Sequence, residues 1–144
     1  MHPYPHHYSV QAKAGAEGTV QLGSAGLPAL ESTSPPEFDG PPGYWSPETL
    51  LLAAAADCYL LSFRAVARAS RLAWSDLQVD VEGVLDRVEG VTRFTEIRFL
   101  PTLRISNAEQ EHLAGNVLDK AKKVCLITNS LNARSELKAT VLVG

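Results

Sequence analysis

The stretch SPETLLLAAAADCYLL, residues 46–61, decides the fold of this chain. Ser46 is a preferred N-cap residue, Pro47 suits the first helical position, and Glu48 puts a negative charge at the positive end of the helix dipole. These signals predict a helix that runs from Ser46 to about Ser70. The first half of this helix has almost no polar face, and a helix that is apolar all round has to be enclosed. We therefore expect a long buried helix that is covered on more than one side.

Alternation of apolar and polar residues predicts strands on both sides of this helix in the sequence. The expected strands are residues 8–13 and 19–22 as one hairpin, a possible third strand at 27–30, a longer hairpin of 77–86 with 94–105 connected through 91–93, and a last strand at 136–143. Residues 31–44 are rich in Ser, Pro and Gly, and such a composition predicts a surface loop.

A second helix is expected to begin near Asn107, with Leu113, Val117, Leu118 and Ala121 on one face. Strands and helices are therefore segregated along the chain, which predicts an α+β fold with antiparallel sheets packed around the long buried central helix. With 144 residues, the chain suffices for one ordinary core, so residues 1–144 are expected to form a single domain. Too little protein remains to cover the apolar helix, and this favours a homodimer.

Charge and hydropathy exclude several classes of partner. The net charge is −3, and basic and acidic residues are interspersed, so no electropositive stripe for nucleic acid is expected. No uninterrupted apolar run reaches the roughly 18 to 20 residues of a membrane span, because Asp57 breaks the longest run. The first residues lack the basic and apolar regions of a secretory signal. We therefore expect a cytoplasmic protein that binds neither nucleic acid nor membrane.

The two cysteines, Cys58 and Cys125, are the first candidates for chemistry. A structural disulfide is rare in a reducing cytosol, so paired use of these thiols favours transient redox catalysis, whereas two unrelated buried thiols are the alternative. A reacting thiol has to be ionised by a nearby donor or cation. Arg64 lies roughly 240° around the helix from Cys58, so any activating charge has to come from another segment or another subunit. Cys125 follows a lysine-rich helix end, which gives no dipole help in ionising and favours a resolving role.

Other residues allow a plain and a functional interpretation. Tyr44 and Trp45 precede the helix, where they either pack against its first turn or line an apolar substrate pocket. Glu48 either compensates the helix dipole or orients an arginine. The terminal histidines His2, His6 and His7 are more often solvated than metal ligands. The sequence has no phosphate-binding Gly-rich loop and none of the CxxC, HExxH and GxSxG motifs, and we expect neither a metal nor a cofactor.

Two separated segments resemble the OsmC/Ohr family, the osmotically inducible and organic-hydroperoxide-resistance proteins. They are residues 45–58 and the later run VCLITNSL at residues 124–131, and the likeness extends over essentially the whole chain. The resemblance implies a thiol-dependent peroxidase that reduces hydroperoxides to alcohols without metal or haem. It also implies an intertwined homodimer with its central helices back to back between two sheets. By position, Cys58 matches the attacking cysteine, Cys125 the resolving one, and Glu48 the glutamate that holds an activating arginine.

The chain departs from the family pattern at two places. The family's peroxidases have the activating arginine in the N-terminal strands, but no arginine precedes Arg64 here, and Leu126 stands where many members have proline. Lys13, or Arg64 or Arg68 from a second subunit, is the expected substitute. We expect a hydroperoxide reductase that is recycled by a dithiol reductant, of the lipoyl type or another thiol. The alternatives are a redox-sensing or small-ligand-binding protein without turnover, and a structural dimer with incidental thiols.

Overall fold

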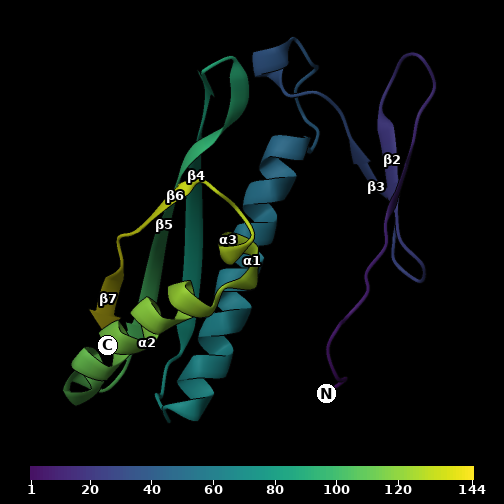
Figure 1. Cartoon of the computed structure of the whole chain (residues 1–144). Helices are drawn as coiled ribbons and strands as arrows, with labels where there is room; N and C mark the ends of the chain where they lie inside the picture. Colours follow the sequence, from purple (N-terminus) through teal and green to yellow (C-terminus); the bar gives the residue numbers. More distant parts are fainter. The chain divides into compact units, whose positions relative to one another are not determined.

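The computed structural model describes all residues, Met1–Gly144, as two compact units, Met1–Leu50 and Leu51–Gly144 (Figure 1). Strands and helices are segregated, which confirms the predicted α+β class. A single domain over residues 1–144 remains a prediction. The elements are β1 Gln11–Lys13, β2 Val20–Gly23, β3 Leu30–Ser32, the 3₁₀ turn η1 Pro36–Phe38, α1 Pro47–Ala69, β4 Asp76–Val88, β5 Val91–Ile105, the 3₁₀ turn η2 Ala108–Gln110, α2 Glu111–Val124, α3 Leu126–Asn129, β6 Arg134–Leu137 and β7 Thr140–Val143.

The first unit contains a three-stranded antiparallel sheet in the order β1-β2-β3. The predicted hairpin is confirmed, although β1 begins at Gln11 rather than at residue 8. The third strand was expected at residues 27–30 and lies instead at Leu30–Ser32. Leu27 closes a turn through a 3.1 Å hydrogen bond from its N–H to the carbonyl of Ser24, and Pro28 follows with no N–H to donate, so pairing starts later.

Helix α1 begins as its sequence predicts. The N–H of Thr49 donates to Oγ of Ser46 at 3.2 Å, and the N–H of Ser46 donates to Oγ1 of Thr49 at 2.9 Å. This reciprocal pair satisfies donors that the first turn of a helix leaves free. By length and composition alone, the 23-residue helix is apolar enough to cross a membrane, so the sequence argument from Asp57 was too strict. A core helix passes the same test, and the absence of a membrane partner stays a prediction.

One side of α1 supplies the core of the second unit. Its buried residues are Ala55, Tyr59, Phe63, Val66 and Ala67, which recur at helical spacing. Leu61, by contrast, has a side chain that is 52% exposed. A single chain therefore encloses only part of the helix that the sequence predicts to be covered all round.

The second unit has a mixed sheet in the order β4-β5-β6, with β7 also paired to β5. β4 and β5 form the predicted long hairpin, but its turn is at Glu89 and Gly90, so residues 91–93 belong to the strand rather than to the connection. β6 and β7 run parallel to β5, so the expectation of wholly antiparallel sheets was wrong in this detail. The reason is the crossover through α2 and α3. It carries the chain back along the sheet, so that the following strands run in the same direction as β5.

The last strand is split in two, contrary to the single strand expected at residues 136–143. β6 pairs with Glu96–Phe99 and β7 with Thr102–Ile105, so the interruption lies opposite Pro101. Proline has no N–H for a ladder, and the break therefore falls where β5 has no donor. On the other edge, Pro101 stays in register with Val79 of β4.

The core lies between this sheet and the helices. Alternate residues of β5, namely Ile97, Phe99, Leu103 and Ile105, form one buried cluster with buried residues of α1 and α2. From α2 the cluster takes Ala114, Val117, Leu118 and Ala121, which confirms the predicted apolar face except that Leu113 is only partly buried. The helix begins with the turn η2, where the side chain of Asn107 accepts the N–H of Glu109 at 2.9 Å.

Candidate active site

The fold brings the two cysteines to one place in the second unit. Cys58 lies in the middle of α1, and its half-buried side chain packs against the core cluster that contains Cys125. Cys125 lies between the end of α2 and the start of α3, and it is 0% exposed. Both thiols are free. The site therefore combines one thiol at the edge of the core with a second thiol buried behind it.

Cys58 lines an open pocket of about 480 Å³ between α1 and α3. The lining residues are Ala54, Asp57, Cys58, Leu61, Ser62, Ala65, Leu126 and Ile127. Most of these side chains are apolar, Asp57 carries the only charge, and none is cationic. Leu126 and Ile127 directly follow Cys125, so the segment that buries the second thiol also forms a wall of the pocket. The pocket suits an uncharged, apolar molecule.

The surroundings of Cys125 oppose its ionisation. Burial raises the pKa of the Cys125 thiol, the hydroxyl of Thr128 lowers it, and the neighbouring Cys58 thiol raises it further. Oγ1 of Thr128 lies 3.2 Å from Sγ of Cys125 and donates a hydrogen bond to it. Burial therefore disfavours the thiolate form of Cys125, and it also shields the sulfur from solvent.

Two of the predicted thiolate activators, Arg64 and Arg68, lie in the same unit as Cys58 but do not reach its pocket. Arg64 and Arg68 are exposed on α1 and do not line the pocket. Lys13 is exposed in β1 of the first unit. Activation of Cys58 by any of these three residues stays a prediction. For the two arginines, the sequence analysis already required that they come from a second subunit.

The other predicted site residues lie at the start of α1. Tyr44 and Trp45 are each 47% exposed, and the carbonyl of Trp45 accepts a 2.9 Å hydrogen bond from the N–H of Thr33. Glu48 stands in the first turn of α1, and its Oε1 atom is buried without a hydrogen-bond partner. An unpartnered buried carboxylate oxygen costs free energy, which favours a cationic partner. That Glu48 holds such a group stays a prediction.

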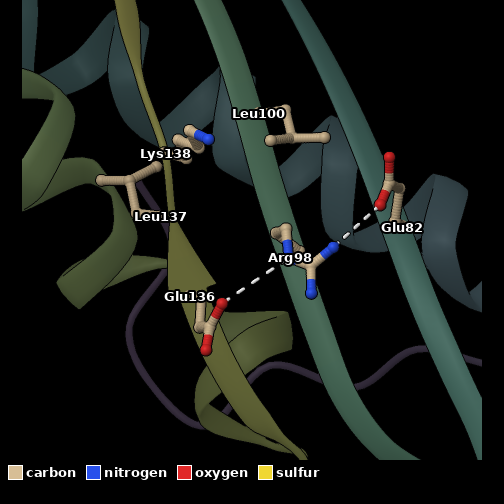
Figure 2. Close-up of a pocket in the computed structure, with 6 residues that line it drawn as sticks. All are labelled: Glu82, Arg98, Leu100, Glu136, Leu137 and Lys138. Carbon is tan, nitrogen blue, oxygen red and sulfur yellow. Dashed lines mark hydrogen bonds and ion pairs between the residues drawn. The ribbon is translucent and has the colours of Figure 1, made fainter.

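One arginine of the second unit is fully engaged elsewhere. Figure 2 shows Arg98 of β5 between Glu82 of β4 and Glu136 of β6. The three side chains help to line an open pocket of about 710 Å³. Its nitrogens lie 3.1 Å from Glu82, 3.6 Å from Glu136 and 3.2 Å from Glu96. Phe99, the next residue, packs on Tyr59 of α1 with ring centroids 5.4 Å apart, so Arg98 points to the opposite face of the sheet. Arg98 therefore does not serve Cys58 of its own chain.

Two residues of the site escaped sequence reasoning. Thr128 contacts the Cys125 sulfur, and Tyr59 donates a 2.9 Å hydrogen bond to the carbonyl of Leu118 in α2. For Thr128 the available signal was its position three residues after Cys125, one helical turn away, once α3 is known. The histidines near the N-terminus interact locally: the ring of His6 hydrogen-bonds the carbonyl of His2 at 2.9 Å and stacks on Tyr4. No group of three or more His, Cys, Asp or Glu residues is arranged to hold a metal ion.

The chain belongs to the OsmC-like protein family, whose model matches residues 40–140. The match includes Glu48, Cys58 and Cys125. A relative from Bacillus subtilis strain 168, named uncharacterized protein YmaD, is 30% identical over an alignment of 145 positions, which covers 96% of this chain and 97% of that protein.

Solved structures share the fold. An OsmC-like protein of unknown function from Vibrio cholerae superposes with a TM-score of 0.84 at 17% identity, over 94% of this chain and 99% of that one. An organic hydroperoxide resistance protein OsmC from Legionella pneumophila gives a TM-score of 0.77 at 24% identity, over 96% and 98%. The organic hydroperoxide resistance protein OhrB of Bacillus subtilis gives 0.69 at 18% identity, over 95% and 98%. The OsmC/Ohr resemblance is thereby confirmed.

Proposed function

We propose that this protein is a thiol-dependent peroxidase that reduces organic hydroperoxides to alcohols. One observation carries the proposal: the half-buried thiol of Cys58 lines an apolar pocket while the second thiol, Cys125, is buried next to it. In the proposed reaction, a peroxide enters the pocket and reaches the first sulfur, and the second sulfur traps the oxidised product. Names of structural relatives that refer to organic hydroperoxide resistance support the same class of substrate.

The chemistry takes two steps in the protein. The thiolate of Cys58 attacks the terminal oxygen of the hydroperoxide, the O–O bond breaks, and the alkoxide takes a proton and leaves as an alcohol. Cys58 is then a sulfenic acid, oxidised by two electrons. The thiolate of Cys125 attacks the Cys58 sulfur, an S–S bond forms, and hydroxide leaves and is protonated to water. A dithiol reductant, lipoyl-type or another thiol, then restores both thiols by exchange and is itself oxidised to a disulfide.

The proposal includes a homodimer in the cytoplasm. Exposed apolar side chains surround the pocket, among them Leu61 at 52% and Leu126 at 65% exposure. A second copy that covers this side of α1 would remove apolar surface from water and enclose the thiol. It would also supply a cation for Cys58, which the pocket of a single chain lacks. Lys13, Arg64 and Arg68 are the candidates for that role.

A redox-sensing or small-ligand-binding role without turnover is the second candidate. The observation that favours it is the lack of any arginine before Arg64. Without an activating cation, the pocket at Cys58 would still bind an apolar molecule, but its thiol would react slowly.

Mass spectrometry after brief treatment with cumene hydroperoxide decides between the two functions. The peroxidase is expected to show one intramolecular Cys58–Cys125 disulfide and to release cumyl alcohol. Cys58→Ser should abolish alcohol formation, whereas Cys125→Ser should stop at a sulfenic acid that dimedone traps. Two free thiols that persist under excess peroxide would refute the peroxidase proposal and support the binding role.

A further inference from the structure

The resolving thiol has a chemical difficulty that the fold creates. Cys125 has to attack as a thiolate, but its side chain is 0% exposed, and burial raises the pKa of its thiol. The titratable groups that face it, the Cys58 thiol and the Tyr59 phenol of α1, carry no positive charge. Lys122 of α2 directs its Nζ to the carbonyl of Ser135 at 3.1 Å. The thiolate therefore receives no cation from these elements.

A hydroxyl group takes the place of a cation at this sulfur. Oγ1 of Thr128 donates to Sγ of Cys125 at 3.2 Å across the single turn of α3. A helical threonine commonly donates its hydroxyl to a backbone carbonyl one turn earlier, as Ser130 does to Leu126 at 2.8 Å in the same segment. Thr128 instead donates its hydroxyl hydrogen bond to the sulfur of Cys125. A hydrogen bond to an ionised acceptor is stronger than one to a neutral acceptor, so this bond favours the thiolate over the thiol.

We propose that Thr128 activates Cys125 for disulfide formation by stabilising its thiolate through the hydroxyl hydrogen bond. This inference rests on the proposed peroxidase function and concerns only the second step. In that step the Cys125 thiolate forms the S–S bond, the S–O bond of the Cys58 sulfenic acid breaks, and hydroxide leaves. The Cys58 sulfenic acid is the two-electron oxidant of this step, and it was formed by the hydroperoxide consumed in the first step. Thr128 has no part in the attack of Cys58 on the peroxide.

The test compares Thr128→Val, Thr128→Ser and Ser130→Ala in the full chain by rapid mixing with cumene hydroperoxide. Quenching with dimedone at set times follows the sulfenic acid, and mass spectrometry follows the disulfide. Thr128→Val keeps the shape of the side chain and removes the donor, so disulfide formation should slow about tenfold at pH 7, as expected for one hydrogen bond to a charged group. The pH midpoint of this step should rise, and sulfenic acid should accumulate.

The two other variants separate chemistry from structure. Thr128→Ser keeps a donor and is expected to recover most of the rate, whereas Ser130→Ala removes a hydroxyl of the same segment that does not touch sulfur and should leave the pH midpoint unmoved. A role of Thr128 in folding alone would lower the melting temperature without shifting that midpoint. If Thr128→Val does not fold, Thr128→Ala is measured in its place.

The outcomes also distinguish this inference from the function on which it rests. If the wild-type protein forms sulfenic acid and disulfide, but the hydroxyl-free variant resolves at the same rate and with the same pH profile, the role of Thr128 is refuted while the peroxidase stands. If the wild-type protein forms no sulfenic acid at Cys58, the proposed function itself fails, and the inference fails with it.

Discussion

The phenol of Tyr59 donates a 2.9 Å hydrogen bond to the backbone carbonyl of Leu118, and this bond joins α1 to α2 inside the core. Tyr59 is 0% exposed and directly follows Cys58, while Leu118 lies in α2, the helix that ends just before Cys125. Burial, with a contribution from Asp119, raises the pKa of Tyr59, so the phenol stays protonated and remains a donor. The bond therefore holds together the two helices that carry the thiols.

Tyr59→Phe tests the importance of this bond. The substitution keeps the ring and leaves the carbonyl of Leu118 with only its helical partner, so the free energy of unfolding should fall by about 1 kcal/mol. Looser packing of α1 on α2 should also slow disulfide formation after peroxide treatment. Urea unfolding measures the first effect, and the control Tyr4→Phe, at a side chain that is 83% exposed, should show neither. Unchanged stability in Tyr59→Phe would mean that water or another group replaces the bond.

Side chains of α1 and β5 fill the space beside Gly83 of β4. A Cβ atom at this position would lie 2.8 Å from Cε1 of Phe94 and 2.9 Å from Cδ2 of Leu52, closer than van der Waals contact permits. Gly83→Ala should therefore destabilise the protein by about 1–3 kcal/mol through overpacking. Gly115 in α2 is the matched control, because a Cβ there meets nothing within 4 Å. Gly115→Ala should stabilise by about 0.5–1 kcal/mol, and equal effects of the two substitutions in calorimetry would contradict the packing argument.

Periodicity predicted the elements whose side chains alternate against one core. The long hairpin β4–β5 and the apolar face of α2 follow from spacing alone, because burial on one side leaves a pattern in the sequence. Helix α1 was predicted instead from its start signals and its apolar composition, which do not show which side is buried. The division of the last strand did not follow, because its cause, Pro101, acts through a pairing partner that only the folded sheet supplies. Likewise, the shift of β3 depends on a turn at Ser24–Leu27 that composition does not locate.

The sequence predicted the two cysteines of the candidate site but not the hydrogen bonds around them. Cys58 and Cys125 were singled out by their chemistry, and the family resemblance gave them roles. The hydrogen bonds of Tyr59 and Thr128 were missed because each depends on how one element packs or turns against another, which residue types do not reveal. Arg98, which the sequence did not single out, is held by three carboxylates on the far face of the sheet.

Alkaline pH should destabilise the protein. Burial raises the pKa of both the Cys125 thiol and the Tyr59 phenol. The unfolded chain therefore releases these protons at lower pH than the native protein, so the free energy of unfolding falls once pH exceeds about 8.5 for the thiol and about 10 for the phenol. Urea unfolding between pH 7 and 11 measures the trend. Cys125→Ser should remove the loss of stability that begins near pH 8.5, and Tyr59→Phe should remove the loss that begins near pH 10. A free energy of unfolding in the wild type that does not change with pH would contradict this prediction.

A homodimer is expected at micromolar concentration. The apolar side of α1 that the single chain leaves open, marked by Leu61, has no other protein to cover it. Analytical ultracentrifugation should give twice the mass of the chain, and Leu61→Asp should shift the distribution towards monomer, because a carboxylate in an apolar interface is unpaired. A wild-type protein that sediments as a stable, folded monomer would rule out this arrangement.

The cation that activates Cys58 should come from Lys13, or from Arg64 or Arg68 of a second copy. The pocket of one chain contains no positive charge, and Glu48 has a buried oxygen without a partner. A lysine ammonium pairs less well with a carboxylate than a guanidinium does, so activation by Lys13 would give a slower peroxidase than activation by an arginine.

The measurement is the pH dependence of Cys58 alkylation by iodoacetamide in a Cys125→Ser background, where Cys58 is the only thiol that can react. Removal of the activating residue by Lys13→Ala, Arg64→Ala or Arg68→Ala should move the midpoint of the profile up by about one pH unit, the equivalent of about 1.4 kcal/mol. Arg134→Ala is the control, because Arg134 is exposed and pairs with Glu136 at 2.9 Å. If none of the three substitutions moves the midpoint further than the control does, activation by these residues is wrong, and the thiol depends on its pocket alone.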